Sequence, residues 1–183
     1  MKFELSVRQL LNVLLVLAWI IFIGLSIDAG AFIVNAIFTI VNPDVVKHLW
    51  QQADLSQLFA YDRGYYFVVN LIIGIVLCTK AWLFYLVINT LHSKDLDIAQ
   101  PFSIKIRQLI LLLSYAALLI GLFSSSGVKY AAWLAGKGIS MPDAHSMRLD
   151  GADVWLLMAV ILFIIAQIFK RGIEIQTEND LTI

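Results

Sequence analysis

The 183-residue chain has little charge and a single cysteine. Only 14% of its residues are Asp, Glu, Lys or Arg, and 61% are hydrophobic, whereas soluble domains have about 25% charged and 45–50% apolar residues. The formal net charge is zero, so no basic surface argues for direct binding to nucleic acid. Cys78 cannot form an intramolecular disulfide and has no Cys or His neighbour at metal-ligand spacing. This composition predicts an integral membrane protein in a lipid bilayer.

Catalytic signatures are missing as well. The chain has no G-x-S-x-G, Walker loop, H-E-x-x-H or G-x-G-x-x-G motif. His48, His92 and His145 fall in three separate loops on both expected sides of the membrane, so no histidine metal site is expected. The sequence therefore does not support an enzyme, and no cofactor is expected.

Four apolar blocks predict an all-α, four-transmembrane-helix bundle in a single membrane domain, residues 1–183. The spans are about 10–41, 64–91, 104–123 and 152–169, and each is near or above the ~20 residues that a spanning helix needs. The first block would be roughly 48 Å long as a helix, so it tilts, protrudes or breaks near Gly30. A cleaved signal peptide ending at "AGA", residues 29–31, is the less favoured alternative.

The outer loops are expected to hold short interfacial helices. Apolar residues recur at spacings of three and four in "NPDVVKHLWQQADLSQLFAY", which predicts an amphipathic helix that begins at Asn42 and Pro43. A second short helix is expected around Val128 to Leu134. Tyr65 and Tyr66 at one end of the second span suit an interfacial aromatic belt.

Basic residues in the flanks favour cytoplasmic termini. With both ends inside, the inner flanks hold seven Lys and Arg residues and the outer flanks five. Several of the inner seven adjoin span ends, in "IKIRQL" and "IFKRG", where the positive-inside rule counts most.

Lys80 interrupts the apolar run "IGIVLCTKAWLFYLV" and is the main candidate for a polar site within the membrane. Counted from Leu91, it lies about 16 Å from the inner end of its span, near mid-membrane. Asp28 lies about 27 Å from the inner end of the first span, so it is the second choice of partner. A hydroxyl of Ser114 or Tyr115, or a freed backbone carbonyl, is the expected partner. A structural role between helices is favoured over a proton relay or an anion site.

Other polar residues support weaker hypotheses. Asp28 near the outer interface is expected to be structural, with cation binding beside Asn35 as the alternative. Asn70 and Asn89 are expected to hydrogen-bond between helices. Four possible metal ligands lie in the outer loop, where a solvated loop is favoured over a divalent-cation site: Asp143, His145, Asp150 and Asp153.

The tail, residues 170–183, is a candidate binding element. Ile173 and Ile175 alternate with polar residues, a pattern of period two that is typical of a strand. The tail is expected either to pack along the inner helix ends or to be read by a basic partner. The residues that such a partner would read are Glu174, Glu178, Asn179 and Asp180.

Two segments carry a family resemblance. The ending "AQIFKRGIEIQTENDLTI" and the segment "DIAQPFSIKIRQLI" resemble the bacterial membrane-protein family called domain of unknown function 2975, over roughly residues 97–123 and 155–183. The resemblance implies a small four-span protein of the bacterial inner membrane, often encoded beside a small helix-turn-helix regulator. It implies no catalytic residues.

These observations favour a non-enzymatic membrane sensor or regulatory protein that acts through its cytoplasmic loop and tail. The alternative is a small transporter or channel component with Lys80 lining a polar path. A four-span chain would do this as a homo-oligomer.

Overall fold

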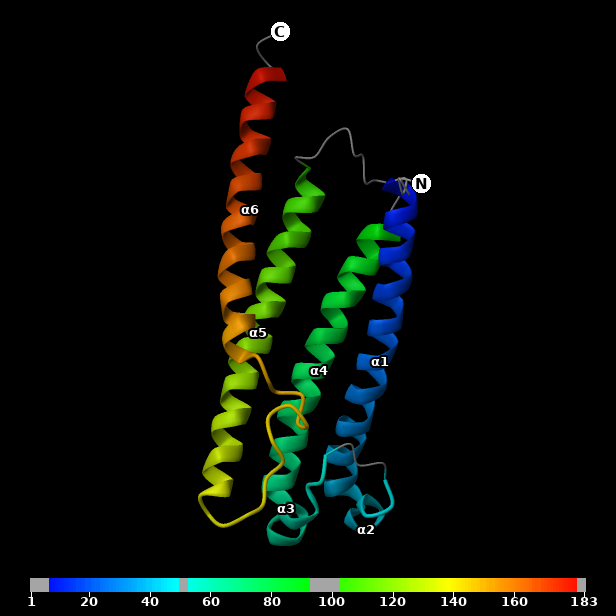
Figure 1. Ribbon diagram of the computed structural model, residues 1–183, viewed down its shortest axis with the longest axis vertical. Helices are drawn as coiled ribbons and strands as arrows, with labels where there is room; N and C mark the ends of the chain where they lie inside the picture. Colours follow the sequence, from blue (N-terminus) through cyan, green and yellow to red (C-terminus); the bar gives the residue numbers. More distant parts are fainter. Residues whose placement is uncertain (1–6, 50–52, 93–102, 181–183) are drawn as a thin grey trace, which may run out of the picture.

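Six helices make up the computed structural model, which describes residues 7–49, 53–92 and 103–180 (Figure 1). No strand occurs within these ranges, and four of the helices are long and apolar enough to cross a membrane. The protein is therefore an all-α, multi-pass membrane protein, as the sequence predicts. The helices are α1 (Val7–Val41), α2 (Pro43–Val46), α3 (Ser56–Tyr61), α4 (Arg63–His92), α5 (Ile104–Ala135) and α6 (Ala152–Asp180).

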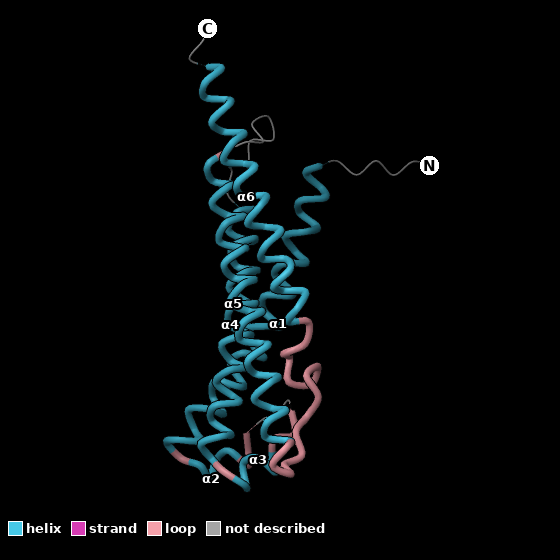
Figure 2. The backbone as a smooth tube through the Cα atoms, turned by 90° about the vertical axis from the view of Figure 1, so that its left-hand side faces the viewer, coloured by secondary structure: helices cyan, strands magenta, loops and turns pink. Residues whose placement is uncertain are grey.

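The long helices pack in the order α1, α4, α5, α6. The start of α1 and the end of α6 lie at one end of the molecule, which we call the terminal side, and α2 and α3 lie at the opposite end, the loop side (Figure 1). The connection between α5 and α6 does not project from the loop side. Figure 2 shows that it turns back along the helices and reaches α6 partway up the molecule.

The start of α6 defines a level that divides the molecule. A Cβ atom at Gly121 would lie 3.1 Å from the Ala152 carbonyl oxygen, so α6 begins beside Gly121, about 21 Å before the end of α5. Irregular backbone cannot face hydrocarbon, because its polar groups would be unsatisfied. We therefore place the hydrocarbon boundary on this side of the molecule at the start of α6, and we call residues 29–49, 53–79 and 122–151, which lie beyond it, the loop-side lobe.

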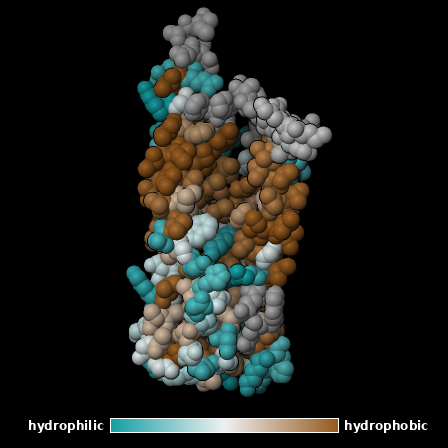
Figure 3. Space-filling model, viewed as in Figure 1, coloured by the Kyte–Doolittle hydropathy of each residue, from teal (hydrophilic) through white to brown (hydrophobic). Residues whose placement is uncertain are grey.

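The helix lengths and the hydropathy of the surface agree with a boundary at the start of α6. From Ala152 to Lys170, α6 spans about 27 Å, and from Ile104 to Gly121, α5 spans about 26 Å, close to the ~30 Å hydrocarbon core. Figure 3 shows a hydrophobic surface on the terminal side, a hydrophilic band near mid-height, and mixed colours over the loop side.

Most of the protein core lies in the loop-side lobe. Tyr66, Ile73 and Leu77 of α4 are fully buried there, together with Met147 and Leu149 of the α5–α6 connection. These side chains are covered because α4 lies between α1 and α5, whereas Ile37, Ile40 and Val41 of α1 are exposed in the same lobe. Tyr66 packs on Phe59, with ring centroids 5.0 Å apart, so the prediction that it faces the membrane interface is wrong.

Helix ends differ from the sequence-based boundaries in two places. The third long helix ends at Ala135 rather than 123, and the short helix expected at 128–134 is its last part. The sequence "SSSGVKYAAWLA" ends the apolar run but not the helix, because Ala131 and Leu134 are buried in the lobe. The fourth helix continues to Asp180.

The length of α1 is explained by protrusion into the lobe. The helix runs without interruption through Gly30, where a Cβ atom would meet nothing within 4 Å. The segment after it forms two short helices instead of one amphipathic helix, and residues 50–52 between them lie outside the described residues. Asn42 is the N-cap of α2 and Pro43 lies in its first turn, as predicted, although the Asn42 side chain makes no capping hydrogen bond.

Candidate functional site

A cluster of charged groups lies where α6 begins. Arg148 of the α5–α6 connection is its centre: its Nη2 is 3.2 Å from Oδ2 of Asp28 on α1, and its carbonyl oxygen accepts a 3.0 Å hydrogen bond from Nζ of Lys80 on α4. The Lys80 ammonium is also 5.7 Å from the ring centroid of Trp155 in the first turn of α6. We call Asp28, Lys80, Arg148 and Trp155 the polar belt.

The connection presents Arg148 by anchoring the residues on either side of it. Met147 and Leu149 are buried in the core, and their amides donate to the carbonyls of Asp143 (3.1 Å) and Ala144 (2.9 Å). Arg148 between them has φ = 59°, a left-handed conformation that costs a non-glycine residue about 1–2 kcal/mol. Such strain persists where the surroundings impose it, and it is common at functional sites.

Gly127 lets the connection reach its place. A Cβ atom there would lie 2.7 Å from Cδ1 of Leu149 and 2.9 Å from Cγ2 of Ile72. Only a glycine on α5 therefore allows α4 and the connection to approach this closely.

Lys80 has a backbone carbonyl as its hydrogen-bond partner, which is one of the expected kinds, but this carbonyl does not lie near mid-membrane. The carbonyl belongs to Arg148 of the α5–α6 connection, beside the start of α6. Ser114 on α5 instead donates a 2.8 Å hydrogen bond to the Ala159 carbonyl of α6, and Tyr115 is 46% exposed. Neither hydroxyl is shown bonded to Lys80.

The estimate that Asp28 and Lys80 differ in depth by about 11 Å is wrong, since Arg148 contacts both. The estimate assumed that the terminal-side ends of α1 and α4 are level. Asp28 lies 21 residues from Val7 and Lys80 only 12 from His92, so these ends are staggered by about 13 Å.

The possible metal ligands of the α5–α6 connection do not converge. His145 Nδ1 lies 3.2 Å from Asp150 Oδ2, with both side chains exposed. Asp143 accepts hydrogen bonds from the hydroxyl and amide of Ser146, and these bonds lower the pKa of the Asp143 carboxyl. Among the described residues no group of three or more His, Cys, Asp or Glu side chains could hold a metal ion.

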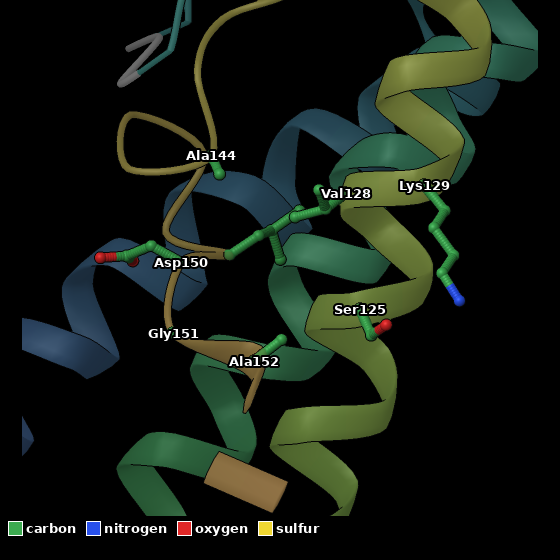
Figure 4. Close-up of a pocket in the computed structure, with 8 residues that line it drawn as sticks. Ser125, Val128, Lys129, Ala144, Asp150, Gly151 and Ala152 are labelled. Atoms are coloured by element: carbon green, nitrogen blue, oxygen red, sulfur yellow. The ribbon is translucent and has the colours of Figure 1, made fainter. Parts of the chain in front are cut away.

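A groove of about 360 Å³ lies between α5 and the connection (Figure 4). Its charged residues, Lys129 and Asp150, point away from each other, and the Val128 side chain extends from α5 toward the connection (Figure 4). A smaller groove of about 260 Å³ lies between α5 and α6 beside Ser114 and Tyr115. Neither brings together a nucleophile, a base and a charge-stabilising group, as catalysis would require. The larger groove is lined by Ser125, Val128, Lys129, Ala144, Leu149, Asp150, Gly151 and Ala152.

Asn70 does not form the hydrogen bond between helices that was expected. It is buried, and its Nδ2 donates a 2.8 Å bond to the Tyr66 carbonyl of the same helix. Asn89 on the same helix is exposed.

The tail is helical, so the strand-like interpretation of residues 173–176 is wrong. Glu174 lies 3.0 Å from Arg171 Nη1 and 4.0 Å from Lys170 Nζ, and pairs at these spacings support a helix. Glu178 is exposed. The side chains of Asn179 and Asp180 lie outside the described residues.

Sequence reasoning missed Arg148, which it treated only as a basic residue of an outer flank. The available signal was local: Arg148 stands directly between the apolar residues Met147 and Leu149. Two apolar residues flanking one charge suggest a segment docked on protein.

Comparison of the chain with protein-family models, with curated proteins and with solved structures found no match.

Proposed function

We propose that the protein is a non-enzymatic membrane sensor or regulator in which α6 couples the loop-side lobe to a cytoplasmic tail. One observation carries the proposal: α6 is a single helix of 29 residues, about 43 Å long. Trp155 in its first turn is part of the polar belt and lies 5.7 Å from the Lys80 ammonium. Its far end extends beyond the other helices (Figure 1).

The belt is suited to act as a two-state latch. When Arg148 is bonded to Asp28 and Lys80, the residues just before α6 are held in place. Release of either contact loosens the hold on the residues between Leu149 and α6, while Met147 and Leu149 stay buried in the lobe. Shifts of 1–2 Å in a helix are a common switching motion, and a continuous helix carries such a shift to its other end.

The proposed location is the bacterial inner membrane, with both termini in the cytoplasm. Support comes from the basic residues at the terminal-side ends of α5 and α6, which fit the positive-inside rule: Lys105, Arg107, Lys170 and Arg171. The tail then places the exposed residue Glu178 in the cytoplasm, together with Glu174, which is paired with Lys170 and Arg171. The resemblance to domain of unknown function 2975 suggests a small helix-turn-helix regulator as the partner of the tail.

The test uses the full chain in its native membrane. Deleting residues 172–183 is expected to abolish capture of the regulator encoded nearby and to change transcription of its target. Arg148→Gln is expected to change transcription while leaving protein abundance and regulator capture intact, and Lys129→Gln, an exposed control in the same lobe, should change neither. Unchanged capture and transcription after the deletion would overturn the proposal.

A flux assay on purified protein in liposomes separates this proposal from transport. A sensor should show no solute or ion flux that depends on Lys80. Flux that is present in the wild type and lost in Lys80→Met would replace the proposal with a transporter or channel.

A further inference from the structure

The far end of the loop-side lobe carries a group of aromatic side chains. Tyr65 of α4 and Trp133 of α5 meet at a right angle, with ring centroids 5.6 Å apart and an interplanar angle of 83°. Tyr130 stacks on Trp133, and Tyr61 stacks on Tyr65. We call the site between the Tyr65 and Trp133 ring faces the aromatic corner.

Membrane anchoring does not explain the aromatic corner. Trp133 lies 12 residues beyond Gly121, about 18 Å past the hydrocarbon boundary, and Tyr65 lies 15 residues from Lys80, about 22 Å past it. The headgroup layer adds only about 5–8 Å on each side of the hydrocarbon. Trp133 is nevertheless 47% exposed and Tyr61 57% exposed, so large aromatic faces are uncovered by protein at this distance from the boundary.

An ammonium group already occupies the corner. Nζ of Lys137 lies 3.7 Å from the ring centroid of Trp133 and 5.1 Å from that of Tyr65. It also lies 3.5 Å from the Tyr65 hydroxyl oxygen. Lys137 is exposed and stands in the turn that ends α5, next to Gly138 with φ = 84°. The two ring faces therefore attract a cation from two perpendicular directions.

We propose that the aromatic corner is a binding site for a small organic cation of the quaternary ammonium class, and that Lys137 is its tethered competitor. A methylated ammonium fits better than the lysine, because a primary ammonium is strongly hydrated and aromatic faces are the usual receptors of quaternary ammonium groups. Asp62 adds a carboxylate nearby, since its Oδ1 accepts a 2.9 Å hydrogen bond from the Tyr65 amide. The proposal does not depend on signalling through α6.

Competition makes the size of the expected effect depend on how often Lys137 occupies the corner. The apparent dissociation constant of a ligand equals its intrinsic value divided by the fraction of molecules with the site free. If Lys137 fills the corner in about nine molecules of ten, its removal should strengthen binding about tenfold.

The experiment uses the full chain in detergent micelles, labelled with 5-fluorotryptophan and observed by 19F NMR. The Trp133 resonance is identified by its loss in Trp133→Phe. Tetramethylammonium chloride is titrated against sodium chloride at equal ionic strength and against neopentyl alcohol, a neutral molecule of similar shape. Tetramethylammonium alone should shift the Trp133 resonance in a saturable way.

Variants at the exposed turn give the decisive comparison. Lys137→Gln should lower the tetramethylammonium midpoint about tenfold, Lys137→Arg should keep it near the wild-type value, and Lys129→Gln should leave it unchanged. Equal shifts with sodium or the alcohol would overturn the proposal, because the corner would then not recognise an organic cation. An unchanged midpoint in Lys137→Gln would remove Lys137 as the competitor.

Discussion

Replacing Lys80 with Met tests the polar belt most directly. The substitution removes the donor to the Arg148 carbonyl, a 3.0 Å bond from a charged group, and such bonds contribute about 1.5–3 kcal/mol. Methionine keeps much of the side-chain volume and avoids the cost of desolvating an ammonium, which offsets part of the loss. We expect the connection to be destabilised by about 1–2 kcal/mol, a factor of roughly 5–30 in its opening equilibrium, while the helices stay folded.

Amide hydrogen exchange measures this opening residue by residue. The Met147 and Leu149 amides are bonded within the connection, so their exchange in Lys80→Met should accelerate by that factor. Amides near Ile73 and Ile120 in the cores of α4 and α5 should be unaffected. Lys129→Met, an exposed lysine in the same lobe, is the matched control.

Two results would refute the reasoning. Unchanged exchange at Met147 and Leu149 would mean that Lys80 does not hold the connection. Equal acceleration along α4, α5 and the connection would mean that Lys80 supports the whole fold, so that local latching is not its role.

Three further predictions concern the same lobe. Gly127→Ala should lower the free energy of unfolding by about 1–3 kcal/mol, because its Cβ atom would lie within 3 Å of two side chains. Gly30→Ala is the control and should not lower it, since Gly30 has open space around it. Denaturant titration monitored by circular dichroism compares the two variants. Arg148→Gly should be more stable than Arg148→Ala by about 1 kcal/mol in the same titration, since both lose the ion pair but only glycine tolerates φ = 59° without strain; equal stability would contradict this. Ser146→Ala should raise the pKa of Asp143 toward its ordinary value in a carboxyl NMR titration. Because the folded pKa is depressed, this turn stabilises the fold above about pH 4 and loses that contribution as the pH falls through the folded pKa.

The long helices could be predicted because hydrophobic blocks of sufficient length have few alternatives in a bilayer. The limits of α5 and α6 could not, since they depend on contacts rather than on composition. Residues 122–135 are helical against a protein core, and residues 170–180 are helical with Lys170 and Arg171 beside Glu174. On α5 the apolar run ends near residue 123, whereas the helix continues to Ala135.

Lys80 was recognisable as a site residue from its charge in an apolar run, but its partner was not. Its depth depends on the stagger of α4 against α1, and its acceptor lies 68 residues away along the chain. Neither the stagger of the helices nor the identity of a distant acceptor can be inferred from local periodicity. The left-handed conformation of Arg148 follows from the burial of Met147 and Leu149, which is likewise a tertiary effect.

The distance along the chain between Lys80 and Arg148 has a consequence for synthesis. At roughly 5–20 residues per second, Arg148 is made about 3–14 s after Lys80. During that interval α1 and α4 can already pack against each other, but the carbonyl that will accept the Lys80 hydrogen bond does not yet exist. Lys80 at mid-membrane would spend those seconds as an unpaired charge in hydrocarbon. At the boundary where α6 will begin, water solvates it until the second pair of helices arrives.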